Sequence, residues 1–138
     1  MTQELKENQT CEAVLTVQTN DLASALSLTG EDAFPEVFAT SRMIALMELA
    51  AARMMKQLLQ QGELSVGVGV NIVHTAATPI GVDVKAIATF IKQEGKLYHF
   101  KVEVFDGGGL VGKGEHTRAV VSTERLVNSA KKRLGRGL

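Results

Sequence analysis

A helix-favouring segment from Arg42 to Gln61 is the feature that most restricts the fold of this chain. It is rich in Met, Leu, Ala, Lys and Gln, which lose little conformational freedom in a helix, and Gly62 follows it as a stop signal. Its middle, Met43–Ala52, is apolar on nearly all sides and carries one carboxylate, Glu48. Because an all-round apolar helix must be covered by other elements, we expect it at the centre of the domain.

Strand-forming residues stand on both sides of this helix in the sequence. Alternation indicates a first strand from Cys11 to Thr19. After Gly62, residues with a high strand preference gather in stretches that predict strands over Ser65–Thr78, Val82–Glu94, Lys96–Phe105 and Leu110–Ser122. Gly95 and the run Asp106–Gly109 mark tight turns between them, and Thr123–Arg133 can form a last amphipathic helix.

This order of elements predicts an α+β hotdog fold, in which an antiparallel sheet wraps around a central helix. A lone sheet of this kind leaves an edge strand unpaired and one end of the helix poorly covered. We therefore expect two copies to join edge to edge as a homodimer.

Length and charge narrow the range of functions. With 138 residues, 45% of them hydrophobic, the chain can bury one core, so we expect a single domain over residues 1–138. Its 15 Lys and Arg balance its 15 Asp and Glu, which argues against nucleic acid or an anionic membrane as a partner. Cys11 is the single cysteine, and the polar N-terminus lacks a secretory signal. We expect a cytoplasmic protein.

Three side chains with catalytic chemistry lie on or beside these elements, and each has a structural alternative. Glu48 is either a catalytic carboxylate at a dimer cleft or a structural acid held by the backbone or an arginine, since a lone charge in apolar surroundings is costly. His74, near the end of a strand, is either a base or a satisfied core histidine. Thr40 either supplies a reactive hydroxyl or caps the helix, as Ser41 also can.

The other motifs are weaker signals. His99 alternates within a strand, and His116 is expected to pair with a neighbouring carboxylate. Gly67 and Gly69 lie within a strand and precede no helix, so they indicate close approach of a ligand or another backbone rather than dinucleotide binding. No spacing of His, Asp or Glu defines a metal site. We expect neither a metal ion nor a cofactor.

Four longer motifs resemble those of a known family. They are Phe34–Thr40, Leu46–Glu48, Val73–Pro79 and Gly112–Val120, in the same order. Together they resemble the fluoroacetyl-CoA thioesterase family of hotdog proteins, over nearly the whole chain from Cys11 onward. The resemblance implies hydrolysis of a small acyl-CoA thioester to free acid and coenzyme A, with fluoroacetyl-CoA as one candidate substrate.

The resemblance also implies a catalytic group and a substrate-binding group. The catalytic group is Thr40, Glu48 and His74, at a site on the dimer interface. The substrate-binding group is Gly67 and Arg118, which help to hold the acyl group, and Phe34, which closes an apolar lid together with Phe38. Whether Thr40, Glu48 or a water molecule attacks the carbonyl stays open at this point, as does the subunit that supplies each residue.

Neither the sequence of the lid nor the fold determines which acyl group is bound or whether the thioester is cleaved. The residues before Phe34 are Glu31, Asp32 and Ala33, which are more polar than the aromatic-rich lid expected of an enzyme that selects a fluorinated acetyl group. A small acyl-CoA is therefore the broader prediction, and its phosphates predict a surface groove with lysine or arginine nearby. Because the same fold can hold an acyl thioester without cleaving it, a non-catalytic acyl-CoA or acyl-carrier binding module is the alternative.

Overall fold

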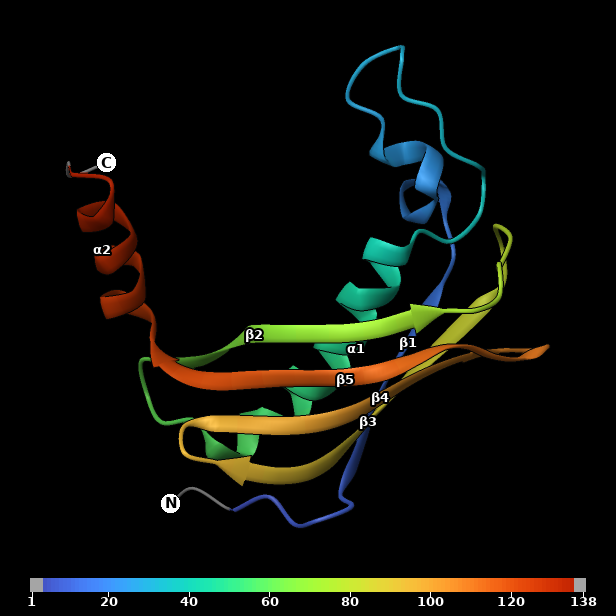
Figure 1. Cartoon of the computed structure of the whole chain (residues 1–138). Helices are drawn as coiled ribbons and strands as arrows, with labels where there is room; N and C mark the ends of the chain where they lie inside the picture. Colours follow the sequence, from blue (N-terminus) through green and yellow to red (C-terminus); the bar gives the residue numbers. More distant parts are fainter. Residues whose placement is uncertain (1–3, 136–138) are drawn as a thin grey trace.

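A curved sheet and the long helix that it surrounds form most of the molecule (Figure 1). The computed structural model describes residues 4–135. Its strands are β1 (Thr10–Thr16), β2 (Glu63–His74), β3 (Asp83–Glu94), β4 (Leu97–Asp106) and β5 (Gly109–Ser122), and its α-helices are α1 (Thr40–Met55) and α2 (Thr123–Arg133). Short 3₁₀ turns cover Thr19–Asp21, Ala23–Leu26 and Lys56–Leu58. The sheet is antiparallel in the order β1-β3-β4-β5-β2, so the predicted hotdog fold is confirmed.

Three predicted elements extend further along the chain than the observed ones. The first strand, predicted to reach Thr19, ends at Thr16. The helix predicted to reach Gln61 ends at Met55 and tightens into the 3₁₀ turn that follows it. The strand predicted to reach Thr78 ends at His74, where the amides of Thr75 and Ala76 both donate to the carbonyl of Val111 instead of continuing the ladder. Pro79 then has no N–H to offer a neighbouring strand.

The core lies between α1 and the concave face of the sheet. Alternate residues of β3 and β4 point toward the helix, and the side chains buried between the two layers include Met43, Met47, Ala50, Met54, Ala86, Ala88, Phe100, Val102 and Val104. The prediction of a helix covered on nearly all sides is wrong for one face of it. Ala45 and Leu49 lie on that face and are exposed, with Leu49 at 43%.

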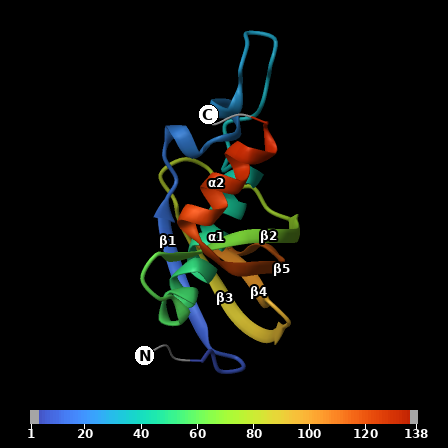
Figure 2. The same ribbon diagram turned by 90° about the vertical axis from the view of Figure 1, so that its left-hand side faces the viewer.

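Strand β2 forms one edge of the sheet and pairs only with β5 within the described part of the chain. Three of its valines are exposed: Val68, Val70 and Val73. The pairing with β5 shifts between Gly67 and Gly69, which leaves Val68 as an extra residue in a β-bulge. Beyond the end of β5, α2 stands away from the sheet with no buried residue (Figure 1), and it lies in front of the rest when the molecule is seen from that side (Figure 2).

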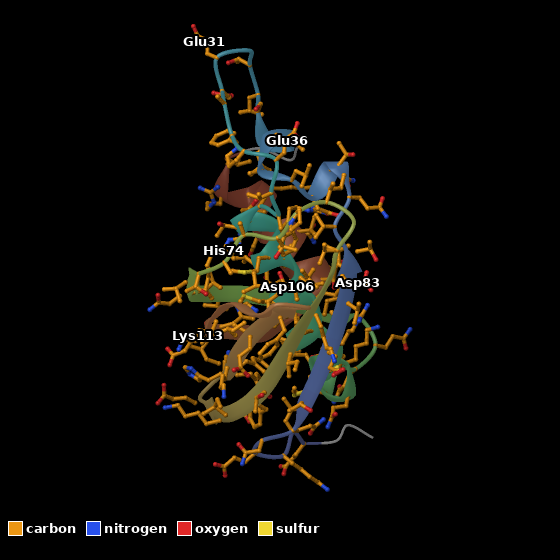
Figure 3. The ribbon with its side chains drawn as sticks, turned by 90° about the vertical axis from the view of Figure 1, so that its right-hand side faces the viewer. Glu31, Glu36, His74, Asp83, Asp106 and Lys113 are labelled. Atoms are coloured by element: carbon orange, nitrogen blue, oxygen red, sulfur yellow. The ribbon has the colours of Figure 1, made fainter. Side chains whose placement is uncertain are left out.

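The segment between β1 and α1, which we call the arm (residues 20–39), folds back on itself above the first turn of α1. Two 3₁₀ turns, Thr19–Asp21 and Ala23–Leu26, lie at its start. The arm is held by an isolated bridge between Leu22 and Phe38. Its outer end, with Glu31, projects well away from the sheet, whereas His74 lies near the start of α1 (Figure 3).

Candidate functional site

Thr40 and His74 form a hydrogen-bonded pair where the arm meets α1. Thr40 is the first residue of α1, and its hydroxyl oxygen lies 2.8 Å from Nδ1 of His74 at the end of β2. The cap position belongs to Ala39, whose side chain makes no capping bond. The prediction that Thr40 or Ser41 caps this helix is therefore wrong, and the hydroxyl of Thr40 is directed at an imidazole instead.

The pair opens into a hollow of about 410 Å³. The arm and the segment after β2 form its walls, with the lining residues Ala23, Pro35, Val37, Phe38, Thr40, His74, Thr75, Ala76 and Ala77. The ring of Phe38 meets the imidazole of His74 edge-on, with centroids 6.5 Å apart. Nε2 of His74 is buried and has no hydrogen-bond partner among residues 4–135. This nitrogen is therefore a buried polar atom that no described residue satisfies.

Phe34 lies on the arm and is 50% exposed. It is not among the residues that line the hollow. Phe38, further along the arm, is the aromatic residue beside His74. The structure thus places Phe38 against His74 and leaves Phe34 outside the lining of the hollow.

Glu48 lies two turns further along α1, facing β5 rather than His74. Eight residues of helix separate it from Thr40, which corresponds to about 12 Å along the helix axis. One carboxylate oxygen, Oε1, accepts a hydrogen bond from Nη1 of Arg118 at 3.0 Å. One protomer therefore brings Thr40 to His74 and Glu48 to Arg118, and it does not bring all three predicted catalytic residues together.

Arg118 is held at every nitrogen of its guanidinium. Nε donates to the hydroxyl of Ser65 and Nη2 to the carbonyl of Ser65, both at 3.0 Å, while Nη1 contacts Glu48 and His116. The Arg118 side chain is 7% exposed and that of Glu48 42%. Burial lowers the pKa of Arg118 from its ordinary value, and the charge of Glu48 opposes that shift. Removing one of these partners would leave part of the buried positive charge uncompensated, which destabilises the folded state.

The absence of a side chain at Gly67 leaves the space that the carboxylate of Glu48 occupies. A Cβ at this position would collide with Oε1 of Glu48 and would lie 3.3 Å from Cε1 of His116. Gly67 faces Arg118 in the β2–β5 register. The prediction for this glycine was close approach of a ligand or another backbone; the group that approaches it in the structure is the side chain of Glu48.

His116 also belongs to the group formed by Glu48, Gly67 and Arg118, which we call the Glu48 cluster, and the sequence analysis did not predict this. The prediction that it pairs with a carboxylate is wrong, because Nδ1 lies 2.8 Å from the carbonyl oxygen of Gly69 and Nε2 lies 3.1 Å from Nη1 of Arg118. Burial is the main cause that lowers the pKa of His116, and Arg118 lowers it further, whereas the Gly69 contact and Glu48 raise it. The available signal was the two-residue spacing from Arg118, which puts both side chains on one face of β5.

The remaining predictions of site residues concern metals and His99. Within residues 4–135 no group of three or more His, Cys, Asp or Glu side chains is placed to hold a metal ion. His99 lies 3.5 Å from Glu94 and lines a separate hollow of about 860 Å³ over β2, β3, β4 and β5. That hollow is lined by none of the predicted catalytic or substrate-binding residues.

Known proteins are similar to this chain in both sequence and fold. The family model described as fluoroacetyl-CoA-specific thioesterase matches residues 17–124. A fluoroacetyl-CoA thioesterase from Streptantibioticus cattleyicolor is 43% identical over 93 residues, which are 67% of each protein. A solved structure of a point mutant of the fluoroacetyl-CoA-specific thioesterase FlK superposes with a TM-score of 0.88 at 32% identity, covering 96% of this chain and 99% of that one.

A second solved structure holds ligands. It is a point mutant of the same thioesterase in complex with fluoroacetate and CoA, with a TM-score of 0.81 and 34% identity, and the match covers 88% of this chain and 99% of that one.

Proposed function

Because this chain belongs to the fluoroacetyl-CoA-specific thioesterase family, we propose that it hydrolyses a thioester between coenzyme A and a small acyl group. Fluoroacetyl-CoA is one candidate substrate. The observation that carries the proposal is the 2.8 Å contact between the hydroxyl of Thr40 and Nδ1 of His74, at the mouth of an open hollow. An alcohol bonded to an imidazole is the arrangement that activates an oxygen nucleophile.

The chemistry needs an activated oxygen, a donor for the developing oxyanion and a proton for the thiolate. His74 takes a proton from Thr40, or from a water molecule that Thr40 positions, as the oxygen attacks the carbonyl. The first turn of α1 supplies backbone N–H groups without intrahelical partners, close to Thr40, to stabilise the oxyanion. The carbon–sulfur bond breaks and the thiolate takes the proton from His74. If Thr40 attacked, water then hydrolyses the acyl ester on Thr40, which releases the free acid and restores the hydroxyl; if water attacked, the free acid forms directly.

Glu48 enters the site through a second copy of the chain in this proposal. Strand β2 is the unpaired edge of the described sheet and has three exposed valines, and one face of α1 is exposed at Ala45 and Leu49. We place the dimer there, with the two β2 strands antiparallel about a two-fold axis. Such an arrangement extends the sheet across both copies, lays the two exposed helix faces side by side and completes the catalytic group from both chains.

The first test is a panel of acyl-CoA esters with release of free thiol followed over time. We expect turnover of short acyl groups, and a loss of kcat of about 10² to 10⁴ in Thr40→Ala and His74→Ala, the usual range for removal of a proton-transfer group. A folded dimer that binds acyl-CoA but releases no thiol from any ester would contradict hydrolysis and support the non-catalytic binding module.

Mixed dimers test the shared site. His74→Ala and Glu48→Gln are each expected to be weakly active alone. If each site takes His74 from one copy and Glu48 from the other, one of the two sites in a mixed dimer is intact, and a statistical mixture should recover about a quarter of wild-type activity. No recovery after verified subunit exchange would assign both residues to the same copy.

The proposed location is the cytoplasm, which Cys11 supports as a single free cysteine. Among the described residues, no helix has both the length and the apolar character required to cross a bilayer.

A further inference from the structure

A buried histidine outside the predicted catalytic group ends a chain of contacts that leads to Glu48. His116 is 2% exposed and lies on the helix-facing side of β5, where it contacts Arg118, which in turn contacts Glu48. The ring of His116 also packs on that of Phe100, with centroids 6.4 Å apart. None of these contacts involves the Thr40–His74 pair.

The partners of His116 determine which of its nitrogens carries the proton. The carbonyl oxygen of Gly69 can only accept, so Nδ1 is the donor in the 2.8 Å contact. The guanidinium of Arg118 can only donate, so Nε2 is the acceptor in the 3.1 Å contact. Both contacts are satisfied by one neutral tautomer, with hydrogen on Nδ1 and a lone pair on Nε2.

The β-bulge in β2 makes this tautomer the favoured one. The extra residue between Gly67 and Gly69 changes the direction of the backbone, and the carbonyl of Gly69 meets the imidazole there. A proton added to Nε2 would face an N–H of Arg118 and place two cations side by side in a buried site. Burial and Arg118 both act against that charge, and Glu48, two contacts away, only partly offsets them.

The lone pair on Nε2 fixes the direction of Arg118. Nη1 has two hydrogens, and its two contacts are Nε2 of His116 and Oε1 of Glu48. Ser65 holds the opposite side of the same planar group. With the guanidinium held on both sides, Oε1 of Glu48 has one position, and the second carboxylate oxygen has no protein hydrogen bond within residues 4–135. That oxygen is open to a reactant.

We infer that His116 is a positioning residue for the proposed hydrolysis, which holds Arg118 in the orientation that fixes the carboxylate of Glu48. The inference rests on the proposed function and extends it to a residue that never touches the substrate. It also accounts for a neutral, buried imidazole beside a buried arginine, since the arginine needs an acceptor there that carries no positive charge.

Two substitutions distinguish the roles of the two ring nitrogens of His116. The amide of His116→Asn reaches the position of Nδ1 and keeps a donor for Gly69, but it leaves Arg118 without its acceptor. The longer His116→Gln places an amide oxygen near the position of Nε2 and keeps that acceptor. We expect kcat to fall about tenfold in the Asn variant, equivalent to about 1.4 kcal/mol, and to be largely retained in the Gln variant. His99→Asn is the matched control and should leave kcat unchanged.

A double-mutant cycle with Glu48→Gln distinguishes positioning from a general structural effect. If His116 acts through Glu48, adding His116→Asn to Glu48→Gln should cost almost nothing further. A full additional tenfold loss in the double variant, or unchanged kcat in His116→Asn alone, would overturn the inference.

Nitrogen NMR of the wild-type imidazoles adds a readout that needs no turnover. For His116 we expect a proton on Nδ1 and none on Nε2. The opposite tautomer would overturn the inference, even if a variant fails to fold. A wild-type protein with this tautomer but no activity on any thioester would instead refute the proposed function, and with it any positioning role in hydrolysis.

Discussion

Replacing Gly67 by alanine should disable the site while leaving the fold nearly intact. The new Cβ would collide with Oε1 of Glu48, which is the far end of a flexible side chain that is 42% exposed. Glu48 can therefore turn toward solvent at little steric cost. Gly67→Ala should lose the Glu48–Arg118 contact and with it most of the activity.

The stability cost follows from the same geometry. Breaking a fully buried ion pair costs about 3 to 5 kcal/mol, but Glu48 is 42% exposed and the buried Arg118 would keep its contacts with Ser65 and His116, so the loss of this pair is closer to about 1 kcal/mol. Gly114→Ala is the matched control, because its Cβ would meet the backbone of Asn71 and the Cα of Ile72 at 2.6 Å. A backbone cannot turn aside as a side chain can, so this variant should lose about 3 kcal/mol or more.

Urea and thermal unfolding at one protein concentration, with kcat measured on the same samples, test this prediction. A loss of 1 kcal/mol corresponds to a fall in Tm of about 4 °C for a domain of this size. We expect Gly67→Ala to be the more stable and the less active of the two variants, when activity is corrected for the folded fraction. If Gly67→Ala unfolds more readily than Gly114→Ala, or keeps wild-type kcat, the role assigned to this glycine is wrong.

Three further predictions concern pH, the sheet edge and the arm. The pKa of His116 is lowered in the folded state, so the unfolded chain binds that proton more tightly, and the free energy of unfolding should fall as pH drops below about 6.5. Urea melts at several pH values should show this slope, weakened in His116→Asn, and an equal slope in both proteins would contradict it. Val70→Lys on β2 should shift the proposed dimer toward monomer in sedimentation, whereas Val14→Lys on the opposite edge strand should not; equal effects would argue against pairing through β2. Asp21→Asn should cost about 1 to 2 kcal/mol in urea unfolding, because the buried Asp21 carboxylate accepts two hydrogen bonds from Arg42, and unchanged stability would contradict it.

The element order and the Thr40–His74 pair were within reach of the sequence for different reasons. The apolar helix and the strands that follow it are local patterns, so the hotdog fold could be predicted from periodicity and turn residues. The pair followed from motifs. Its geometry did not, because Thr40 has the composition of a helix cap, and only the tertiary fold shows that its hydroxyl is bonded to His74 instead.

The Glu48 cluster was beyond a strand-by-strand prediction because of the bulge in β2. Strict alternation puts Gly67 and His74 on opposite faces, since seven residues separate them. The extra residue at Val68 restores both to the helix-facing side, opposite Arg118 and Gly112 in β5. A bulge is set by the partner strand and by backbone twist, and neither is visible in a single strand's sequence. His116 was missed because its importance depends on that register.

The attachment of the arm has a consequence for attempts to change substrate preference. Asp21 lies at the base of the arm, and Arg42 lies in the first turn of the helix that begins with Thr40. The arm contributes Pro35, Val37 and Phe38 to the walls of the hollow. Grafting a foreign arm onto this scaffold would therefore disturb the anchoring of the helix that begins with Thr40, unless the graft includes a residue that can bind Arg42.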